Sequence, residues 1–199
     1  MMARCGGSNL LIDCGEGTQV ALKERAGALN PLILSALHIT MRIISVVFRV
    51  CVLTMGNAER TEPLTLIGPR GLERVVNALR MIAPELPFEL RMIELTENRQ
   101  QLTAGPYIID AYKVNHNVLC YGYTIRIPRK GRFDVERAKE QQIPQKFWNR
   151  LQKGEEIECE GRLLTPDMVL GPDRRGLKVT YCTDTRPVPV IAEYAAGSD

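Results

Sequence analysis

The chain has 199 residues, of which 45% are hydrophobic and 25% are charged, a balance that suits one globular domain and excludes a disordered or collagen-like chain. Its net charge of +3 is too small to indicate nucleic-acid binding from composition alone. The chain holds two histidines, His38 and His116, so no site that needs three or more imidazoles can be assembled from it.

The first half of the chain alternates predicted strands and helices. An apolar run at residues 10–13 predicts a strand that ends on a carboxylate, followed by a glycine-rich loop and a helix at residues 20–26. Residues 32–55 are dominated by Ile, Val and Leu and predict buried strands. A strand at residues 65–67 precedes a helix at residues 70–82, whose apolar side chains fall on one face.

The second half continues this alternation around a charged segment at residues 128–176. Its predicted elements are strands at residues 88–95, 107–112, 121–127 and 177–182, and helices at residues 134–141, 145–152 and 187–196. The interleaving of strands and helices predicts an α/β fold or a layered α+β sandwich.

The cysteines and the apolar segments bear on the compartment. The six cysteines are scattered without a CxxC pair, which argues against a disulfide framework and a zinc ribbon and favours reduced, buried thiols: Cys5, Cys14, Cys51, Cys120, Cys159 and Cys182. The start of the chain has no signal-peptide pattern. Residues 39–55 are too short to span a bilayer and contain two arginines, so we expect a cytoplasmic protein without a membrane span.

Three segments could carry chemistry, because each presents a polar side chain next to a predicted strand. Asp13 ends the first strand, His116 precedes a strand, and Asp184 lies in the loop after the last strand. Taken singly, each residue is better explained by turn, cap or structural hydrogen bonding.

Together these segments resemble ribonuclease Z, the tRNA 3′-processing endonuclease of the metallo-β-lactamase fold. The resemblance covers nearly the whole chain from Ser8 to Asp199. It rests on residues 11–19 (Leu-Ile-Asp-Cys-Gly-Glu-Gly-Thr-Gln), 53–60 (Leu-Thr-Met-Gly-Asn-Ala-Glu-Arg), 67–69 (Ile-Gly-Pro), His116 before 121–123 (Tyr-Gly-Tyr), and 184–186 (Asp-Thr-Arg). The fold it implies is an incomplete αββα sandwich, a single domain over residues 1–199 with residues 128–176 inserted as a protruding arm.

The resemblance implies a metal-dependent endoribonuclease that removes the 3′ trailer of a tRNA precursor. Two zinc ions would activate water for attack on the phosphodiester. His116 matches the family's isolated histidine ligand and Asp184 its bridging aspartate. Asp13, with Gly15 and Glu16, matches a loop that supports the site without binding metal.

The resemblance also implies partners. Family members are homodimers whose arms grip the tRNA. Basic and aromatic residues in this arm could contact phosphates and stack on bases: Lys146, Phe147, Trp148, Arg150 and Lys153. The alternative for this segment is a solvated, poorly packed insertion whose glutamates dilute the charge.

The chain departs from the family at its main ligand cluster. After Ile39 and Thr40, residues 41–51 contain no His or Asp, so the family's His-x-His-x-Asp-His motif is missing. The thiol of Cys51 is the one competent ligand there, and His38 is interpreted as a structural strand residue outside the motif. Family members also have segments before Ser8 and beyond Asp199, including a last histidine ligand, so we expect a chain truncated at both ends.

A local frameshift offers one hypothesis for this departure. Residues 41–51, back-translated with permitted codons and read one nucleotide out of phase, give His-Ala-Asp-His-Ile-Ser-Gly-Val-Pro-Gly-Leu, the later part of the missing motif. A second shift near Val52 restores the family's frame. As an amino-acid string, residues 41–52 are a β-prone apolar segment.

Three functional hypotheses follow. The first is a crippled ribonuclease Z that binds zinc weakly or not at all and does not cleave. The second is a pseudoenzyme that acts as a tRNA-binding or dimer-partner module. The third and weakest is a different hydrolase of the same fold, and the matches at residues 56–60 and 184–186 argue against it.

Overall fold

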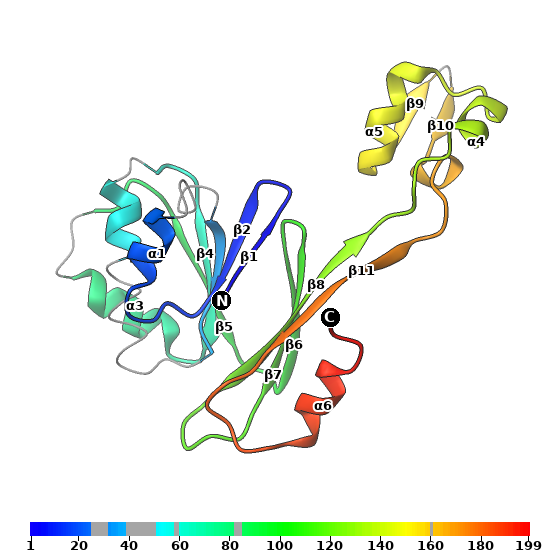
Figure 1. Cartoon of the computed structure of the whole chain (residues 1–199). Coiled ribbons are helices and arrows are strands. Elements are labelled where there is room, and N and C mark those ends of the chain that lie inside the picture. The colour runs from blue at the N-terminus through cyan, green and yellow to red at the C-terminus, as the bar shows by residue number, and fades with distance from the viewer. Residues whose placement is uncertain (25–31, 39–50, 58–59, 82–84, 160) are drawn as a thin grey trace. The chain divides into compact units, whose positions relative to one another are not determined.

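The computed structural model describes residues 1–24, 32–38, 51–57, 60–81, 85–159 and 161–199. These form two compact units, residues 1–127 with 178–199, and residues 128–177 (Figure 1). The segment at residues 39–50, which includes most of the postulated frameshift, lies outside the described residues. No helix in the described ranges is long and apolar enough to cross a membrane.

The first sheet of the larger unit has five strands in the order β1-β2-β3-β4-β5. Their bounds are β1 Met2–Cys5, β2 Ser8–Ile12, β3 Leu32–Ala36, β4 Leu64–Pro69 and β5 Leu90–Leu95. β1 and β2 form an antiparallel hairpin, and β2 to β5 pair in parallel. The hairpin turns at Gly6 and Gly7, whose φ angles of 55° and 80° suit a two-residue turn that glycine adopts without strain. No strand was expected from the sequence at the position of β1, Met2–Cys5.

Helices cover one face of this sheet (Figure 1). α1 (Thr18–Glu24), residues 51–57 and α3 (Leu72–Arg80) supply apolar side chains to a common core with the strands. The members from the helices are Leu22, Cys51, Val52, Met55, Leu72 and Val76. The strand prediction for residues 51–55 is therefore wrong. Cys51, Val52 and Met55 share one face at helical spacing, and an apolar run alone does not distinguish a buried helix from a strand.

The second sheet has the order β11-β8-β7-β6. Its strands are β6 Arg99–Ala104, β7 Tyr107–Lys113, β8 Tyr121–Arg129 and β11 Arg174–Tyr181. β6 was missed because its sequence, Arg-Gln-Gln-Leu-Thr-Ala, has one large apolar residue and lies at the sheet edge, where polar side chains are tolerated. Its hairpin with β7 turns at Gly105, which has a φ of 54°.

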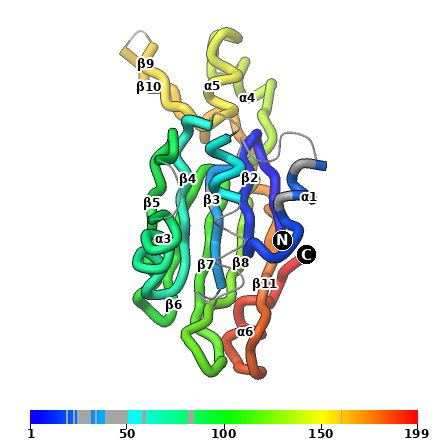
Figure 2. Tube along the Cα trace, turned by 90° about the vertical axis from the view of Figure 1, so that its left-hand side faces the viewer, coloured from blue at the N-terminus to red at the C-terminus, as the bar shows by residue number. Residues whose placement is uncertain are grey.

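The two sheets pack face to face, as the perpendicular view of Figure 2 shows. Between them lie buried residues of β2, β3 and β4 against tyrosines and aliphatic residues of β7 and β8: Leu10, Ile12, Ala36, Ile67, Tyr107, Ile109, Ala111, Tyr121, Tyr123 and Ile125. α6 (Pro189–Ala195) packs on the other face of the second sheet, where Tyr194 stacks on Tyr112 at 4.3 Å. The layer order is helix, sheet, sheet, helix, and it confirms the αββα expectation.

The smaller unit has a hydrophobic core of its own. Its elements are α4 (Val135–Glu140), a 3₁₀ turn (Gln145–Phe147), α5 (Trp148–Lys153), the hairpin of β9 (Ile157–Cys159) with β10 (Arg162–Leu164), and a second 3₁₀ turn (Pro166–Met168). The core residues are Ala138, Ile143, Leu151, Ile157, Leu164, Val169 and Leu170. The alternative of a poorly packed insertion is therefore wrong, because these apolar residues are widely spaced in sequence and meet only in the folded unit.

Candidate functional site

The carboxyl ends of β2 and β3 bring Asp13 and His38 together. The two strands are parallel and pair Ile12 with Ala36, so the residues that follow them emerge at one edge of the sheet. The backbone N–H of Asp13 donates to the carbonyl of Ala36 at 2.9 Å. The backbone N–H of His38 in turn donates to Oδ1 of Asp13 at 3.0 Å. Asp13 has a φ of 57°, a left-handed conformation that Asp tolerates better than most residues.

Asp184 completes a row of three side chains. It lies in the loop after β11 with a φ of 51°, and its Oδ2 is 3.0 Å from Nε2 of His38. On the other side of the ring, Nδ1 of His38 is 2.7 Å from Oδ2 of Asp13, an ion-pair distance without hydrogen-bond alignment. The imidazole of His38 therefore lies between two carboxylates.

The electrostatics of this row favour a charged imidazole. Burial of the ring works against protonation, but Asp13, and after it Asp184, raise the pKa of His38 above its usual 6.5. The His38 side chain is 3% exposed, whereas that of Asp184 is 56% exposed. The row thus runs from the half-buried carboxylate of Asp13 to the exposed carboxylate of Asp184.

The second sheet fixes the backbone on which His38 sits. The hydroxyl of Tyr123 donates to the carbonyl of Leu37 at 2.7 Å, and the backbone N–H of Tyr121 donates to the carbonyl of His38 at 2.9 Å. Tyr181, at the end of β11, has its pKa raised to about 12 by burial and by the charge of Asp13. The Tyr-Gly-Tyr segment of the sequence analysis therefore positions residues 37 and 38 from across the sandwich.

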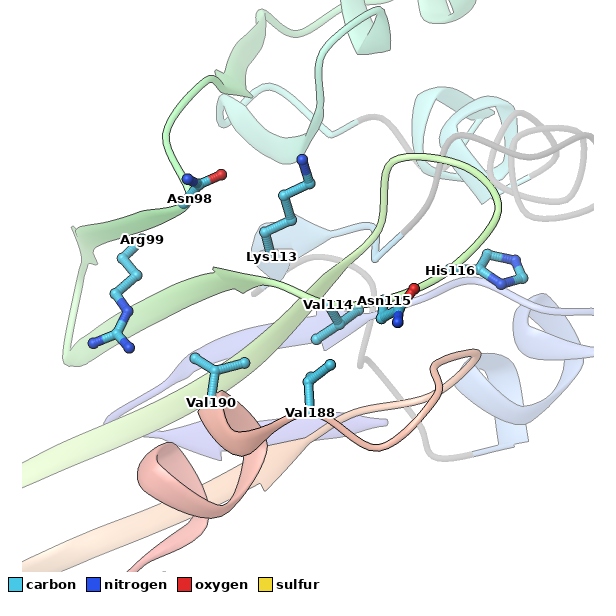
Figure 3. A pocket seen from close by; sticks show the side chains of 8 residues that line it. All are labelled: Asn98, Arg99, Lys113, Val114, Asn115, His116, Val188 and Val190. Atoms are coloured by element: carbon cyan, nitrogen blue, oxygen red, sulfur yellow. The ribbon is translucent and has the colours of Figure 1, made fainter.

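His116 lies close to this row in the fold without joining it. Its neighbour Asn115 pairs with the loop that carries Asp184, since the backbone N–H of Arg186 donates to Asn115 at 2.8 Å and that of Asn115 donates to the hydroxyl of Thr185 at 3.1 Å. The half-buried His116 lines a groove of about 530 Å³, and Figure 3 shows its ring directed away from Val188 and Val190 on the groove wall. The groove also holds Asn98, Arg99 and Lys113.

The described donors do not fit a pair of zinc ions. Among the residues that the structure describes, no three side chains of His, Cys, Asp or Glu lie close enough together to hold a metal ion. A zinc site needs at least three protein ligands. Asp184 instead contacts His38, which the sequence analysis placed outside the site. The roles of His116 and Asp184 as metal ligands stay predictions.

His38 could have been found from one signal. Like Asp13, it follows a buried apolar run, and parallel neighbours end at the same sheet edge. Of the predicted supporting loop, Gly15 accepts the side-chain hydrogen bond of Thr18 at 2.6 Å at the start of α1, and Glu16 is exposed. The loop thus anchors the helix that follows Asp13.

The predicted substrate-binding residues of the smaller unit divide into packed and exposed side chains. Trp148 packs against the core, donates from Nε1 to the carbonyl of Ile143 at 2.9 Å and lies against Phe133 with ring centroids 5.3 Å apart. The Lys146 ammonium lies 4.8 Å from the ring centroid of Phe147, and Arg150 pairs with Glu155 at 2.7 Å. Lys146, Arg150 and Lys153 are exposed. Phe147 and Trp148 therefore serve the core of the unit, which the sequence analysis did not anticipate.

Comparisons with known proteins supply the family. The chain is 54% identical over 200 residues to a ribonuclease Z of Lachnoclostridium phytofermentans, and the match covers 100% of this chain and 66% of that protein. It is 59% identical over 194 residues to a ribonuclease Z of Agathobacter rectalis, covering 97% of this chain and 64% of that protein. The chain thus spans slightly less than two thirds of these relatives. No protein-family model matches it.

Solved structures support the fold. The short form of human tRNase Z matches with a TM-score of 0.54 and 21% identity, over 62% of this chain and 55% of that one. A diphosphatase of the PhnP family matches with a TM-score of 0.50 and 14% identity, over 61% and 46% of the two chains. With the observed layer order, these likenesses confirm the metallo-β-lactamase fold.

Proposed function

This chain belongs to the ribonuclease Z family, and we propose that the reaction of its family is the endonucleolytic removal of tRNA 3′ trailers. We also propose that this chain, as it stands, does not catalyse that reaction. In this family, zinc ions would acidify water and stabilise the charge that develops on the phosphodiester. The described residues of this chain do not assemble such a site, so no hydrolytic step is assigned to them.

One observation carries the proposal of inactivity. Asp184, which matches the bridging aspartate, has its Oδ2 3.0 Å from Nε2 of His38. Among the described residues, it does not belong to any group of three side chains that could hold a metal ion. The sequence holds no third histidine, and residues 41–51 supply neither His nor Asp. Even if both histidines bound a metal ion, two imidazoles would be fewer than a dinuclear site of this family requires.

Cleavage of a trailer-bearing tRNA precursor tests this proposal. The full chain is incubated with the precursor in zinc and, in parallel, in EDTA, with the Lachnoclostridium phytofermentans ribonuclease Z as the positive control. We expect no product above the EDTA reaction and less than one tightly held zinc ion per chain by metal analysis. Zinc-dependent cleavage at the trailer, or a stoichiometric pair of ions, would overturn the proposal.

A second candidate is a non-catalytic tRNA-binding module, and the independent core of the smaller unit favours it. That core holds exposed Lys146 and Lys153 on one short stretch of turn and helix without needing a catalytic centre. Such lysines would contact phosphates, and each phosphate contact contributes to the salt dependence of binding.

Binding of tRNA to the chain at several salt concentrations tests this second candidate. We expect the double variant Lys146→Ala and Lys153→Ala to bind more weakly and to lower the slope of log K against log salt by about 2. The double variant Arg74→Ala and Arg80→Ala, which removes two exposed positive charges from α3 in the larger unit, is the matched control. Equal losses in both variants would contradict the assignment. Dimerisation, which the family resemblance implies, is tested separately by light scattering.

A further inference from the structure

Two buried cysteines meet in the core of the larger unit. The sulfur atoms of Cys14 and Cys51 lie 3.0 Å apart, and both residues are 0% exposed. Both are free thiols. They are 37 residues apart in sequence, so the fold alone brings them together.

The elements around this pair hold it in place. Cys14 follows Asp13 in the loop after β2, and Cys51 opens the helical residues 51–57. Both sulfurs belong to the core cluster on the helical face of the first sheet, which also contains Leu22, Val52 and Met55. A disulfide needs its sulfurs about 2.05 Å apart, so a shift of about 1 Å joins them.

We propose that Cys14 and Cys51 form a dithiol that a peroxide converts into an intramolecular disulfide, fastening the Asp13 loop to the helix at residues 51–57. A peroxide is the oxidant of choice because hydrogen peroxide is little larger than the water molecules that enter protein interiors. The inference does not rest on tRNA processing, because it is argued from a contact between two buried thiols that the proposed function does not use.

The contact between the thiols assigns their roles. The two thiols share a hydrogen bond in which either sulfur can be the donor. This contact with Cys14 lowers the pKa of Cys51 against the opposing effect of burial. The same contact, together with burial, raises the pKa of Cys14. Cys51 is therefore the nucleophile, because the thiolate is the reactive form of cysteine.

The reaction balances with one peroxide. The Cys51 thiolate attacks one oxygen, the O–O bond breaks, and the sulfur becomes a sulfenic acid while the released hydroxide takes a proton and leaves as water. The Cys14 sulfur then attacks the sulfenic sulfur, the S–S bond forms, and the expelled hydroxide leaves as a second water with the Cys14 proton. Two electrons pass from the two sulfurs to the peroxide.

The disulfide would also restrain the neighbouring row. Asp13, which contacts His38, is adjacent to Cys14 in the chain. A cross-link between residues 14 and 51 restricts the unfolded chain, so oxidation should raise resistance to unfolding. This gives a second readout that does not depend on identifying the bond itself.

Peptide mapping of the full chain tests the proposal. The reduced protein is treated with hydrogen peroxide, the remaining thiols are alkylated, and cross-linked peptides are identified by mass spectrometry. We expect one dominant disulfide between residues 14 and 51, a higher urea midpoint, and reversal of both by dithiothreitol. Cys51→Ala and Cys14→Ala should each abolish the cross-link, whereas Cys159→Ala, in the smaller unit, should leave it intact.

A parallel reaction in guanidinium chloride separates the folded geometry from chance pairing. The unfolded chain should give a mixture of pairings among its six cysteines. The same mixture from the native protein, a different dominant pair, or Cys14 and Cys51 both recovered as free thiols while other cysteines are oxidised would each overturn the proposal.

Discussion

Substitution of Gly122 by Ala should destabilise the larger unit, because the second sheet has no room for a Cβ at that position. Gly122 pairs directly with Tyr112 across β7 and β8. A Cβ on Gly122 would lie 2.6 Å from Cε2 and 2.7 Å from Cζ of Tyr112. The Tyr112 ring has no freedom to retreat, since it is 0% exposed and stacks on Tyr194 at 4.3 Å with an interplanar angle of 8°.

The expected loss in free energy of unfolding is that of an overpacked core, about 1–3 kcal/mol. The assay is urea denaturation followed by far-UV circular dichroism, with the fluorescence of Trp148, the single tryptophan, reporting the smaller unit as an internal control. Gly56→Ala is the matched substitution, because its Cβ would meet Leu86 at an ordinary 3.4 Å. That helical position should gain about 0.5–1 kcal/mol from alanine.

Two results would refute this reasoning. One is a Gly122→Ala protein within about 0.5 kcal/mol of the parent, the range expected of a substitution without a packing consequence. The other is an unchanged loss in a Tyr112→Leu background, where the ring that creates the conflict is absent. A loss that shrinks in that background locates the effect at the contact between Gly122 and Tyr112.

Three further predictions concern other buried groups. Leu151→Ala should destabilise the smaller unit by about 2–5 kcal/mol, because Leu151 is 0% exposed in its core, and Trp148 fluorescence in urea should report the change. Tyr123→Phe should lower stability by about 1–3 kcal/mol by leaving the carbonyl of Leu37 without its donor, and thermal unfolding measures it; an unchanged midpoint would contradict the role of that bond. Burial raises the pKa of Tyr112 from 10.0 to about 12. The unfolded chain therefore loses this proton at a lower pH than the folded protein, and the free energy of unfolding falls as the pH rises from about 10 to about 12. Tyr112→Phe should make urea midpoints fall less steeply over that range.

The elements that the sequence predicted well are those with strong local patterns. The one-sided apolar spacing at residues 70–82 corresponds to α3, which spans Leu72–Arg80, and the apolar run at residues 10–13 overlaps β2. The edge strand β6 and the short hairpin of β9 with β10 escaped prediction. Their sequences are polar or only three residues long, and they are strands because of the partners beside them.

The candidate site divides in the same way. Asp13 and Asp184 were recognised from motifs that are local in sequence, and the lack of a histidine cluster follows from counting. The place of His38 between them depends on the parallel pairing of β2 with β3 and on the loop after β11. His38 and Asp184, which make contact there, are 146 residues apart in sequence. No local pattern encodes such a contact.

The sequence by itself indicated the family, the layered α/β class and the absence of His and Asp from residues 41–51, because these depend on residue identity and short-range spacing. The tertiary structure decided that His38 lies between two carboxylates, that Cys14 meets Cys51, and that the charged segment has its own core. These features rest on side chains far apart in the chain, which strand order and helix packing bring within a few ångströms of each other.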